Sequence, residues 1–406
     1  MKFSDLVGSW FTVLVLSLAT LFVATRPVQA QTETVLYNFC LDPGCSDGIN
    51  PYSSLTSDAA GNFYGTTISG GEFGQGAVFE LSPNGNGGWN EAVLYNFCPL
   101  AGCTDGSSPY SSLIFDSAGN LYGTAGAGGA NEDGVVFELS PMGASWTEKV
   151  LHSFANGADG ANPMSGLIMD PAGNLYGTTT NGGTNGTGTV FELSPSGSNW
   201  TEQVIYSFDN NSGYDALATL TMDAAGNIFG VEPSTVFELS PNGKGGWNPT
   251  VIHTFTGAPK DGSNAEGTLV LDKTGNLYGT TISGGHNHNG GTIYELRLGK
   301  KGRWTEKILH SFGSRKDGSV PVAGIVFDAA GNIYGTTAGG GKYHYGTVYE
   351  LGADDGKYKE KLLCNFNYYF GQNPYGGLIW DSVGNLYGTT EWGGSSNAGV
   401  VFEVTP

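Results

Sequence analysis

Five Asp-Gly pairs recur along the chain at points where carboxylates could act together. They are Asp47, Asp105, Asp159, Asp261 and Asp317. A ring of carboxylates facing one ligand could bond the hydroxyl groups of a sugar or hold Ca²⁺. The spacing lacks the dense Asp/Asn pattern of a calcium loop, so we predict neither a metal site nor a cofactor. The alternative is that each pair only forms a turn, because Asp bonds nearby backbone groups and Gly adopts positive φ.

A second set of candidate residues combines aromatic rings with histidines in glycine-rich segments. Its members are His286, His288, Tyr343, His344, Tyr345, Tyr369 and Trp392. Exposed rings beside Asp, Asn and His are typical of carbohydrate sites, where ring faces stack on sugars and polar groups bond hydroxyls. We therefore predict a non-catalytic module that binds an extracellular ligand, with a polysaccharide as the favoured ligand. His-x-His in such a loop is more often solvated than metal-bound.

Two other functions stay open at this point. An extracellular lyase or hydrolase would need two carboxylates, or a carboxylate and a histidine, at a defined separation. His344 with Asp317 or Asp261 would supply such a pair, although no sequence signature selects them. A protein-interaction scaffold for a cell-surface partner is the third interpretation.

The elements that position these residues belong to a repeat of about fifty residues. The phrase D-x-x-G-N begins at Asp58, Asp116, Asp170, Asp223, Asp272, Asp328 and Asp381. A period of this length indicates a propeller or a solenoid. Each period holds four short segments rich in β-branched and aromatic residues, and D-x-x-G-N lies between the first two, where a tight hairpin turn fits.

The two ends of the chain decide between these architectures. TETVLYNF, just after residue 30, reads as a fourth strand, whereas the last segment, VVFEVT, reads as a third strand. The N-terminal strand would then complete the last blade and remove the exposed sheet edges. We predict that residues 31–406 form one all-β seven-bladed β-propeller with four antiparallel strands per blade.

Three details refine this prediction. Pairs of small residues precede the apolar part of each first strand, as at Ser53-Ser54, which would relieve crowding near an axis. The fourth repeat shortens the segment between Phe229 and Phe237, which predicts a notch in the rim. Histidines share one strand position with tyrosines, and five tryptophans open fourth strands, so both sets are predicted to pack. They are His152, His253 and His310, and Trp89, Trp146, Trp200, Trp247 and Trp304.

The unit D-x-x-G-N-[LFI]-[YF]-G-T-T…G-G…G-x-V-[FY]-E-L resembles the Gloeo/Verruco, or GloVer, repeat of bacterial secreted and surface-anchored proteins with interchangeable C-terminal anchors. The resemblance covers essentially all of the chain after residue 30. It implies an exported bacterial β-rich repeat protein, and it supplies no catalytic residues. The chain ends at VVFEVTP without an anchor of that kind.

The N-terminus predicts export. Lys2, an apolar run from Trp10 to Ala24 and small residues at Val28 and Ala30 are typical of a secretory signal peptide, here residues 1–30. The alternative, an uncleaved membrane anchor, would need an uninterrupted apolar run of about 20 residues. The formal charge of −20 argues against nucleic acid and anionic membranes as partners. We expect a secreted monomer, extracellular or periplasmic.

Cysteine spacing agrees with an oxidising compartment. Cys40 with Cys45 and Cys98 with Cys103 form two matching C-x₄-C pairs, which predict two local disulfides. A metal site is the alternative, but zinc usually takes closer spacings. Cys364 occupies the strand position filled by Tyr or His elsewhere, which predicts a buried free thiol.

Overall fold

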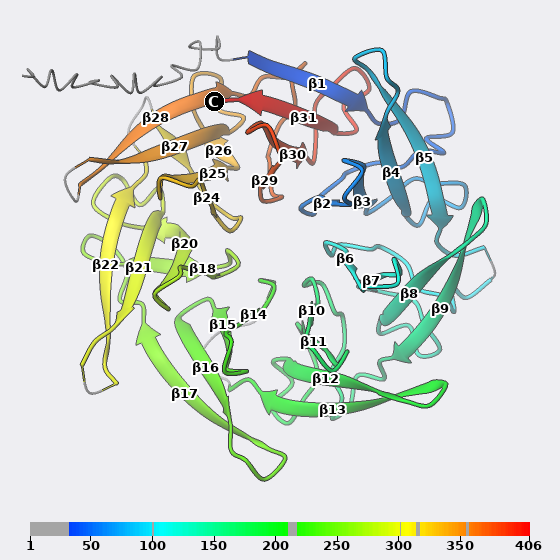
Figure 1. Ribbon diagram of the computed structural model, residues 1–406, viewed down its shortest axis with the longest axis horizontal. Helices are drawn as coiled ribbons and strands as arrows, with labels where there is room; N and C mark the ends of the chain where they lie inside the picture. The colour runs from blue at the N-terminus through cyan, green and yellow to red at the C-terminus, as the bar shows by residue number, and fades with distance from the viewer. Residues whose placement is uncertain (1–31, 100, 210–216, 301, 314–316, 355–356) are drawn as a thin grey trace, which may run out of the picture. The chain divides into compact units, whose positions relative to one another are not determined.

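The computed structural model describes one compact unit, and the predicted signal peptide lies outside the described residues. The described residues are 32–99, 101–209, 217–300, 302–313, 317–354 and 357–406. Within them all regular structure is β, and seven antiparallel sheets surround a common centre (Figure 1). The prediction of a seven-bladed β-propeller is confirmed. No helix among these residues is long and apolar enough to cross a membrane.

The first three blades run from the inner to the outer strand in chain order. Blade 1 comprises β2 (Thr56–Ser57), β3 (Phe63–Thr67), β4 (Ala77–Pro83) and β5 (Trp89–Asn96). Blade 2 comprises β6 (Ile114–Phe115), β7 (Leu121–Ala125), β8 (Val135–Met142) and β9 (Ser145–Ser153). Blade 3 comprises β10 (Ile168–Met169), β11 (Leu175–Thr179), β12 (Thr189–Ser196) and β13 (Asn199–Ser207).

Blades 4 to 6 repeat this order with small additions. Blade 4 comprises β14 (Thr221–Met222), β15 (Ile228–Glu232), β16 (Thr235–Pro241) and β17 (Trp247–Thr254). Blade 5 comprises β19 (Val270–Leu271), β20 (Leu277–Gly284), β21 (Thr292–Leu298) and β22 (Trp304–Ser311), with β18 (Gly262–Ala265) added to β20. Blade 6 comprises β24 (Val326–Phe327), β25 (Ile333–Thr337), β27 (Thr347–Asp354) and β28 (Lys357–Asn365), beside a ribbon of β23 (Gly318–Ser319) and β26 (Gly339–Gly340).

Blade 7 joins the two ends of the chain. It comprises β29 (Ile379–Trp380), β30 (Leu386–Thr390), β31 (Val400–Thr405) and, as its outer strand, β1 (Thr32–Asn38). β1 and β31 are antiparallel, with Thr32 opposite Thr405 and Asn38 opposite Val400 (Figure 1). The predicted closure by the N-terminal strand is therefore confirmed.

The D-x-x-G-N phrase forms the turn between the two inner strands. In blade 2, Asp116 accepts hydrogen bonds from the backbone N–H of Ala118 (2.8 Å) and Asn120 (2.9 Å). The Asn120 side chain donates a third bond to Asp116 at 2.8 Å. Gly119 has φ +88°, a conformation that glycine adopts without strain. One carboxylate thus satisfies several turn donors, which explains why Asp and Asn recur together.

The residues that follow this phrase pack the second strand of the blade against the third strand and bond it to the next blade. A Cβ on Gly123 would lie 2.7 Å from Phe137 Cζ on the next strand, so only glycine fits beneath that ring. Thr124 Oγ1 donates to the carbonyl oxygen of Ser165 in blade 3 at 2.9 Å. Thr389 makes the matching bond to Ser53 at 2.8 Å, across the closure between blades 7 and 1. The motif therefore encodes both a hairpin and a connection to the next blade.

Aromatic side chains fill the space between blades. Phe39, which follows β1, is fully buried and meets Phe79 of blade 1 edge-on at 5.0 Å. The fourth-strand tryptophans reach the preceding blade, as Trp200 does at Tyr122 with a centroid distance of 6.3 Å. The packing role predicted for these tryptophans agrees with such contacts. Burial of this apolar surface between sheets is the main force that holds a propeller together.

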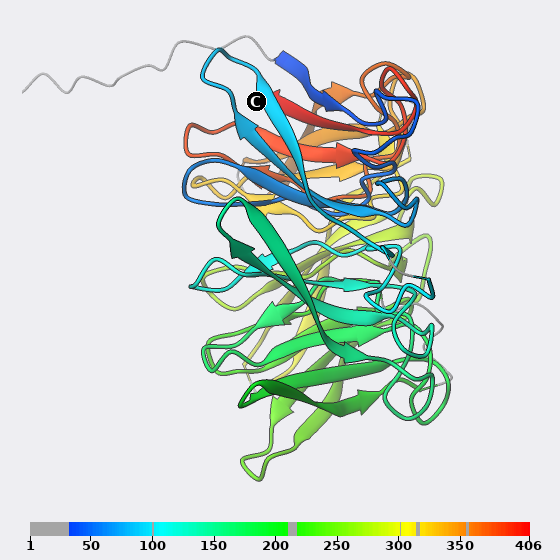
Figure 2. The same ribbon diagram turned by 90° about the vertical axis from the view of Figure 1, so that its right-hand side faces the viewer.

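The loops between blades share one face with the loops between second and third strands. Ile49 pairs with Ser69, and Gln372 pairs with Trp392, as isolated antiparallel bridges between these two kinds of loop. Figure 2 shows loops along both edges of the ring. In blade 4 the second loop is reduced to Pro233-Ser234, between β15 and β16, as its short repeat predicts. The preceding loop, 210–216, lies outside the described residues, so the notch stays a prediction.

Candidate functional site

The five Asp-Gly aspartates lie at the interfaces between adjacent blades, which we call seams. Asp47 accepts from the backbone N–H of Cys40 at 2.9 Å and from the Tyr37 hydroxyl at 2.8 Å. Asp105 makes the same two bonds, with Cys98 and Tyr95, both at 2.9 Å. Both carboxylates thus bond the backbone at the start of their own loop and the tyrosine of the preceding outer strand, as the turn interpretation of the Asp-Gly pairs expects.

In the other three seams a histidine replaces the tyrosine. Nε2 of the histidine lies 3.3 Å from Asp159 for His152, 3.6 Å from Asp261 for His253 and 3.2 Å from Asp317 for His310. The histidine position predicted to pack therefore also contacts a carboxylate. Asp317 contacts His310 and accepts from the Gly318 N–H, whereas His344 is exposed, and the pairing of His344 with Asp317 or Asp261 considered from sequence stays a prediction.

A glutamate from the next blade's outer strand completes each seam. Burial is the first cause that raises the pKa of these glutamates, and the loop aspartate adds to it. The pKa rises to about 7 for Glu91 and Glu202, to about 8 for Glu148 and Glu306, and to about 9 for Glu360. Glu148, Glu306 and Glu360, whose pKa reaches about 8 or 9, therefore keep their proton at pH 7 beside the loop aspartate.

The predicted aromatic residues do reach solvent on the loop face. Tyr343, Tyr345, Tyr369 and Trp392 are between 37% and 76% exposed, and Tyr368 beside Tyr369 is 47% exposed. We call these five residues the rim patch. His286, His288 and His344 are also exposed.

Backbone hydrogen bonds hold the rim patch together. The Asn373 N–H donates to the Tyr345 carbonyl at 3.0 Å, which joins blade 6 to the loop before blade 7. The Gly394 N–H donates to the Tyr368 carbonyl at 2.9 Å, which places Tyr368 beside the loop that carries Trp392. The patch is thus one surface built from adjacent loops of blades 6 and 7.

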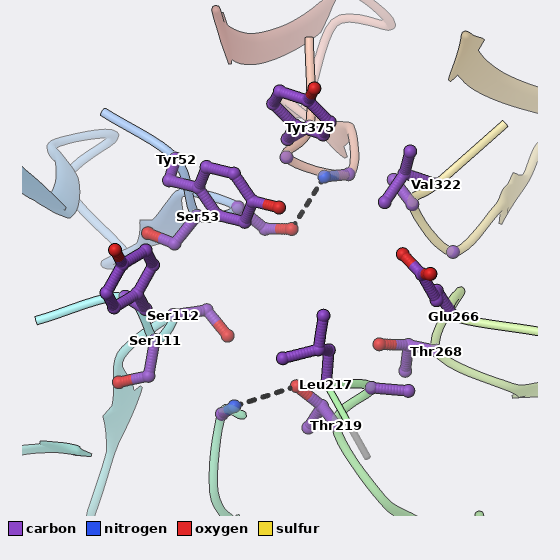
Figure 3. Close-up of a pocket in the computed structure, with 18 of the residues that line it drawn as sticks. Tyr52, Ser53, Ser111, Ser112, Leu217, Thr219, Glu266, Thr268, Val322 and Tyr375 are labelled. Carbon is purple, nitrogen blue, oxygen red and sulfur yellow. Dashed lines mark hydrogen bonds between the residues drawn. The ribbon is translucent and has the colours of Figure 1, made fainter. Parts of the chain in front are cut away.

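A cavity of about 190 Å³ lies where the first strands converge (Figure 3). One repeat position, just before the small pair of each blade, supplies its largest side chains. Those side chains are Tyr52, Tyr110, Met164, Leu217, Glu266, Val322 and Tyr375. Tyr52 stacks on Tyr375 at 4.7 Å and meets Tyr110 edge-on at 5.7 Å, so the aromatic members gather on blades 7, 1 and 2. We call these seven residues the axial ring.

Small residues beneath the axial ring make the cavity possible. A Cβ on Gly166 would lie 2.6 Å from both Ser112 Oγ and Thr219 Oγ1 of the two neighbouring blades. The Gly166 N–H donates to Thr219, and the Gly377 N–H donates to Ser54, both drawn in Figure 3. The crowding predicted from the small pairs is therefore present.

Glu391 lies between the rim patch and the axial ring. Its carbonyl oxygen accepts from the Asn50 side chain at 3.1 Å, and it directly precedes Trp392. Burial raises the pKa of the Glu391 carboxyl, and the Glu391 charge contributes to raising the pKa of Tyr52 and Tyr375, in both of which burial is the larger cause. Glu391 is therefore near the axial tyrosines and belongs to the loop that carries Trp392.

The axial ring is the part of the site that sequence reasoning missed. The pairs of small residues predict crowding near the axis, but they do not by themselves indicate that the residue immediately before each pair lines a cavity. The signal was available, because aligning the seven repeats shows this position changing among Tyr, Met, Leu, Glu and Val while its neighbours stay small. Variation at one position in an otherwise uniform repeat marks a surface that the fold does not constrain.

The cysteine predictions are confirmed. Cys40 with Cys45 and Cys98 with Cys103 form disulfides in equivalent loops, and Cys364 is buried and free. Burial, with the nearby Glu33 carboxylate, raises the pKa of the Cys364 thiol, which keeps it protonated and unreactive.

These features define a closed propeller with one face of paired loops over an axial cavity. The chain belongs to the Gloeobacter/Verrucomicrobia repeat family, whose profile matches residues 18–234 and 231–406. No curated protein matches the chain.

Solved structures confirm the architecture. Virginiamycin B lyase from Staphylococcus aureus is 14% identical, with a TM-score of 0.56 over 93% of this chain and 99% of the lyase. The extracellular domain of a hybrid two-component system from B. thetaiotaomicron is also 14% identical, with a TM-score of 0.55 over 93% of this chain and 41% of that one. At such identities the likeness concerns the fold alone.

Proposed function

We propose that this protein is a non-catalytic carbohydrate-binding module whose site runs from the axial ring to the rim patch. The observation that carries the proposal is the number of aromatic side chains on the loop face, where exposed rings in the loops of blades 6 and 7 accompany the packed rings of Tyr52, Tyr110 and Tyr375 at the axis. Sugar rings present apolar faces that stack on such side chains, while their hydroxyl groups bond to neighbouring polar atoms. Monomeric proteins seldom expose so many grouped rings without a binding role.

The cavity suits a small group rather than a whole chain. At about 190 Å³ it is smaller than the roughly 300–1,000 Å³ typical of pockets for drug-sized ligands. A terminal or branching sugar would enter the axial ring, and the following residues of the polysaccharide would cross toward Trp392. Glu266 lines the cavity and Glu391 lies near it, so two carboxyl groups are in place to bond sugar hydroxyl groups.

Secretion is part of the same proposal. The predicted N-terminal signal peptide and the two disulfides support a location outside the reducing cytoplasm, where polysaccharides would be accessible. The extracellular propeller domain from B. thetaiotaomicron is a precedent for the architecture in that setting.

Binding to a panel of polysaccharides tests the proposal. For a polysaccharide that binds, Tyr52→Leu and Trp392→Ala should each weaken affinity about tenfold, because one stacked ring contributes roughly 0.5–1.5 kcal/mol and 1.4 kcal/mol is a factor of ten. Val251→Ala, at an exposed side chain on the outer strand of blade 4, and Phe73→Ala, at an exposed ring of blade 1 outside the patch, should leave affinity unchanged.

Other results would redirect the assignment. Loss of binding in the two controls as well would reject this site. Release of shorter saccharides during incubation would favour the lyase or hydrolase. If no polysaccharide in the panel binds and the protein captures a cell-surface protein, the scaffold would be favoured.

A further inference from the structure

Among the described residues, two of the blade seams each bring a histidine, an aspartate and a glutamate close together. Between blades 4 and 5, His253, Asp261 and Glu306 each offer a ligand atom, and these atoms lie within 4.8 Å of one another. Between blades 5 and 6, His310, Asp317 and Glu360 form the same set. Both sets join an outer strand, a loop and the next blade's outer strand, so each connects two blades.

In the set between blades 4 and 5, the separations from the histidine nitrogen to the carboxylate oxygens are wider than hydrogen bonds. His253 Nε2 lies 3.6 Å from Asp261 Oδ2 and 3.8 Å from Glu306 Oε1, and both Nε2 and Oε1 are buried without a hydrogen-bond partner. His310 Nε2 lies 3.2 Å from Asp317 Oδ2, and Glu360 Oε1 is likewise buried without one. Metal–ligand bonds of about 2.0–2.1 Å in a tetrahedron place neighbouring ligand atoms roughly 3.3–3.4 Å apart.

The tyrosine seams provide an internal comparison. There the Tyr37 and Tyr95 hydroxyls close hydrogen bonds of 2.8 and 2.9 Å to their aspartates, although the glutamate oxygen is without a partner there too. A neutral phenol is a poor metal ligand, whereas an imidazole nitrogen is the most common one. In the His253 and His310 seams an imidazole nitrogen takes the place of the phenol, and it lies close enough to both carboxyl groups to share a cation with them.

We propose that His253, Asp261 and Glu306, and likewise His310, Asp317 and Glu360, each bind one divalent cation of the zinc class and clamp adjacent blades. One imidazole and two carboxylates supply three ligands, and water completes a four-coordinate site. The two carboxylates balance the charge of the cation.

Zinc titration of the purified, chelator-treated protein tests this proposal. Calorimetry and elemental analysis at pH 7.5 should find about two Zn²⁺ per chain, and Zn²⁺ should raise the Tm by several degrees. The variant carrying His253→Tyr and His310→Tyr copies the protein's own tyrosine seams, so it should fold in chelator like the wild type and lose both cations.

Matched variants separate the seams from other histidines. His286→Ala with His288→Ala removes the exposed loop histidines, and His152→Tyr alters the one histidine seam whose atoms are not so grouped. Both should retain about two Zn²⁺. Should the tyrosine variant fail to fold, Glu306→Gln with Glu360→Gln replaces a ligand from each set by a near-isostere, and it should also abolish binding.

Cobalt provides a readout that does not depend on any variant. Co²⁺ added to the wild-type protein should develop the intense visible absorption of a four-coordinate site. Absence of Zn²⁺ binding at micromolar concentrations in the wild type, or binding that survives the seam substitutions and disappears with His286 and His288, would overturn the proposal. This test is independent of carbohydrate binding.

Discussion

Two sets of carboxyl groups recur around the ring, and their chemistry is opposite. The turn aspartates, such as Asp116, lie among backbone and side-chain N–H donors. Although burial opposes ionisation, those hydrogen bonds lower the pKa of Asp116 below its usual value. The seam glutamates, such as Glu148, are buried beside another carboxyl group, and their pKa rises to about 8. The same functional group is therefore a charged cap in one place and a protonated packing group in the other.

The comparison shows which repeated residues serve the fold. Both sets hold backbone or blade contacts in place, and both follow the repeat. The axial ring follows no such rule, because its side chains point into a cavity rather than into a seam. Repetition within one chain thus identifies structure, and departure from it identifies a surface available for binding.

Removing a turn carboxylate should have the largest effect on stability. Asp116→Ala leaves three N–H donors without their charged acceptor, so the free energy of unfolding should fall by about 2–3 kcal/mol. Glu148→Gln, in the same blade, replaces a carboxyl group that is already neutral at pH 7 and should cost less than about 1 kcal/mol. Denaturant unfolding of both variants measures the difference. Equal losses in the free energy of unfolding would contradict the contrast between charged turn aspartates and protonated seam glutamates.

Removing a seam disulfide should have an intermediate effect. Cys98 and Cys103 close a loop of sequence separation 5 that carries the N–H donor to Asp105. Their joint replacement by Ser should lower the free energy of unfolding by about 2 kcal/mol, chiefly through the entropy of the unfolded chain. Thermal unfolding under oxidising conditions provides the measurement. A loss below about 0.5 kcal/mol would mean that the aspartate bonds alone hold the loop.

The pH dependence of stability should show the smallest effect. A glutamate whose pKa is raised in the folded state contributes stability that is complete below pH 4.5 and is lost as pH rises toward about 7 to 8. The turn aspartates act in reverse and contribute stability that is lost as pH falls below about 3.8. In chelator, Tm should therefore fall by a few degrees between pH 5 and pH 9, and Glu148→Gln should reduce this slope. A Tm that rises over that interval would contradict the assignment of protonated seams.

Much of the architecture could be predicted because each local signal had one structural solution. Asp followed by Gly-Asn could only cap a turn, and a fourth-type strand at residue 32 needed the third-type strand at residue 405 beside it. The rim aromatics were also identified from composition alone. The sequence did not show where the side chains of Asp47 and its equivalents would point. An Asp-Gly pair that forms a turn and one that faces a ligand have the same sequence, and only the position of the neighbouring blade distinguishes them.

The amino-acid sequence by itself determined the blade count, the closure, the disulfides and the buried thiol, since these follow from repeated local patterns and from pairing at the ends. Only the tertiary structure decided which carboxyl groups meet. Asp261 lies in the loop between blades 4 and 5, whereas Glu306 lies on the outer strand of blade 5, and no local sequence pattern pairs them. They share one seam because consecutive blades pack face to face. The axial cavity arises in the same way, because seven first strands converge on a centre that no single repeat contains.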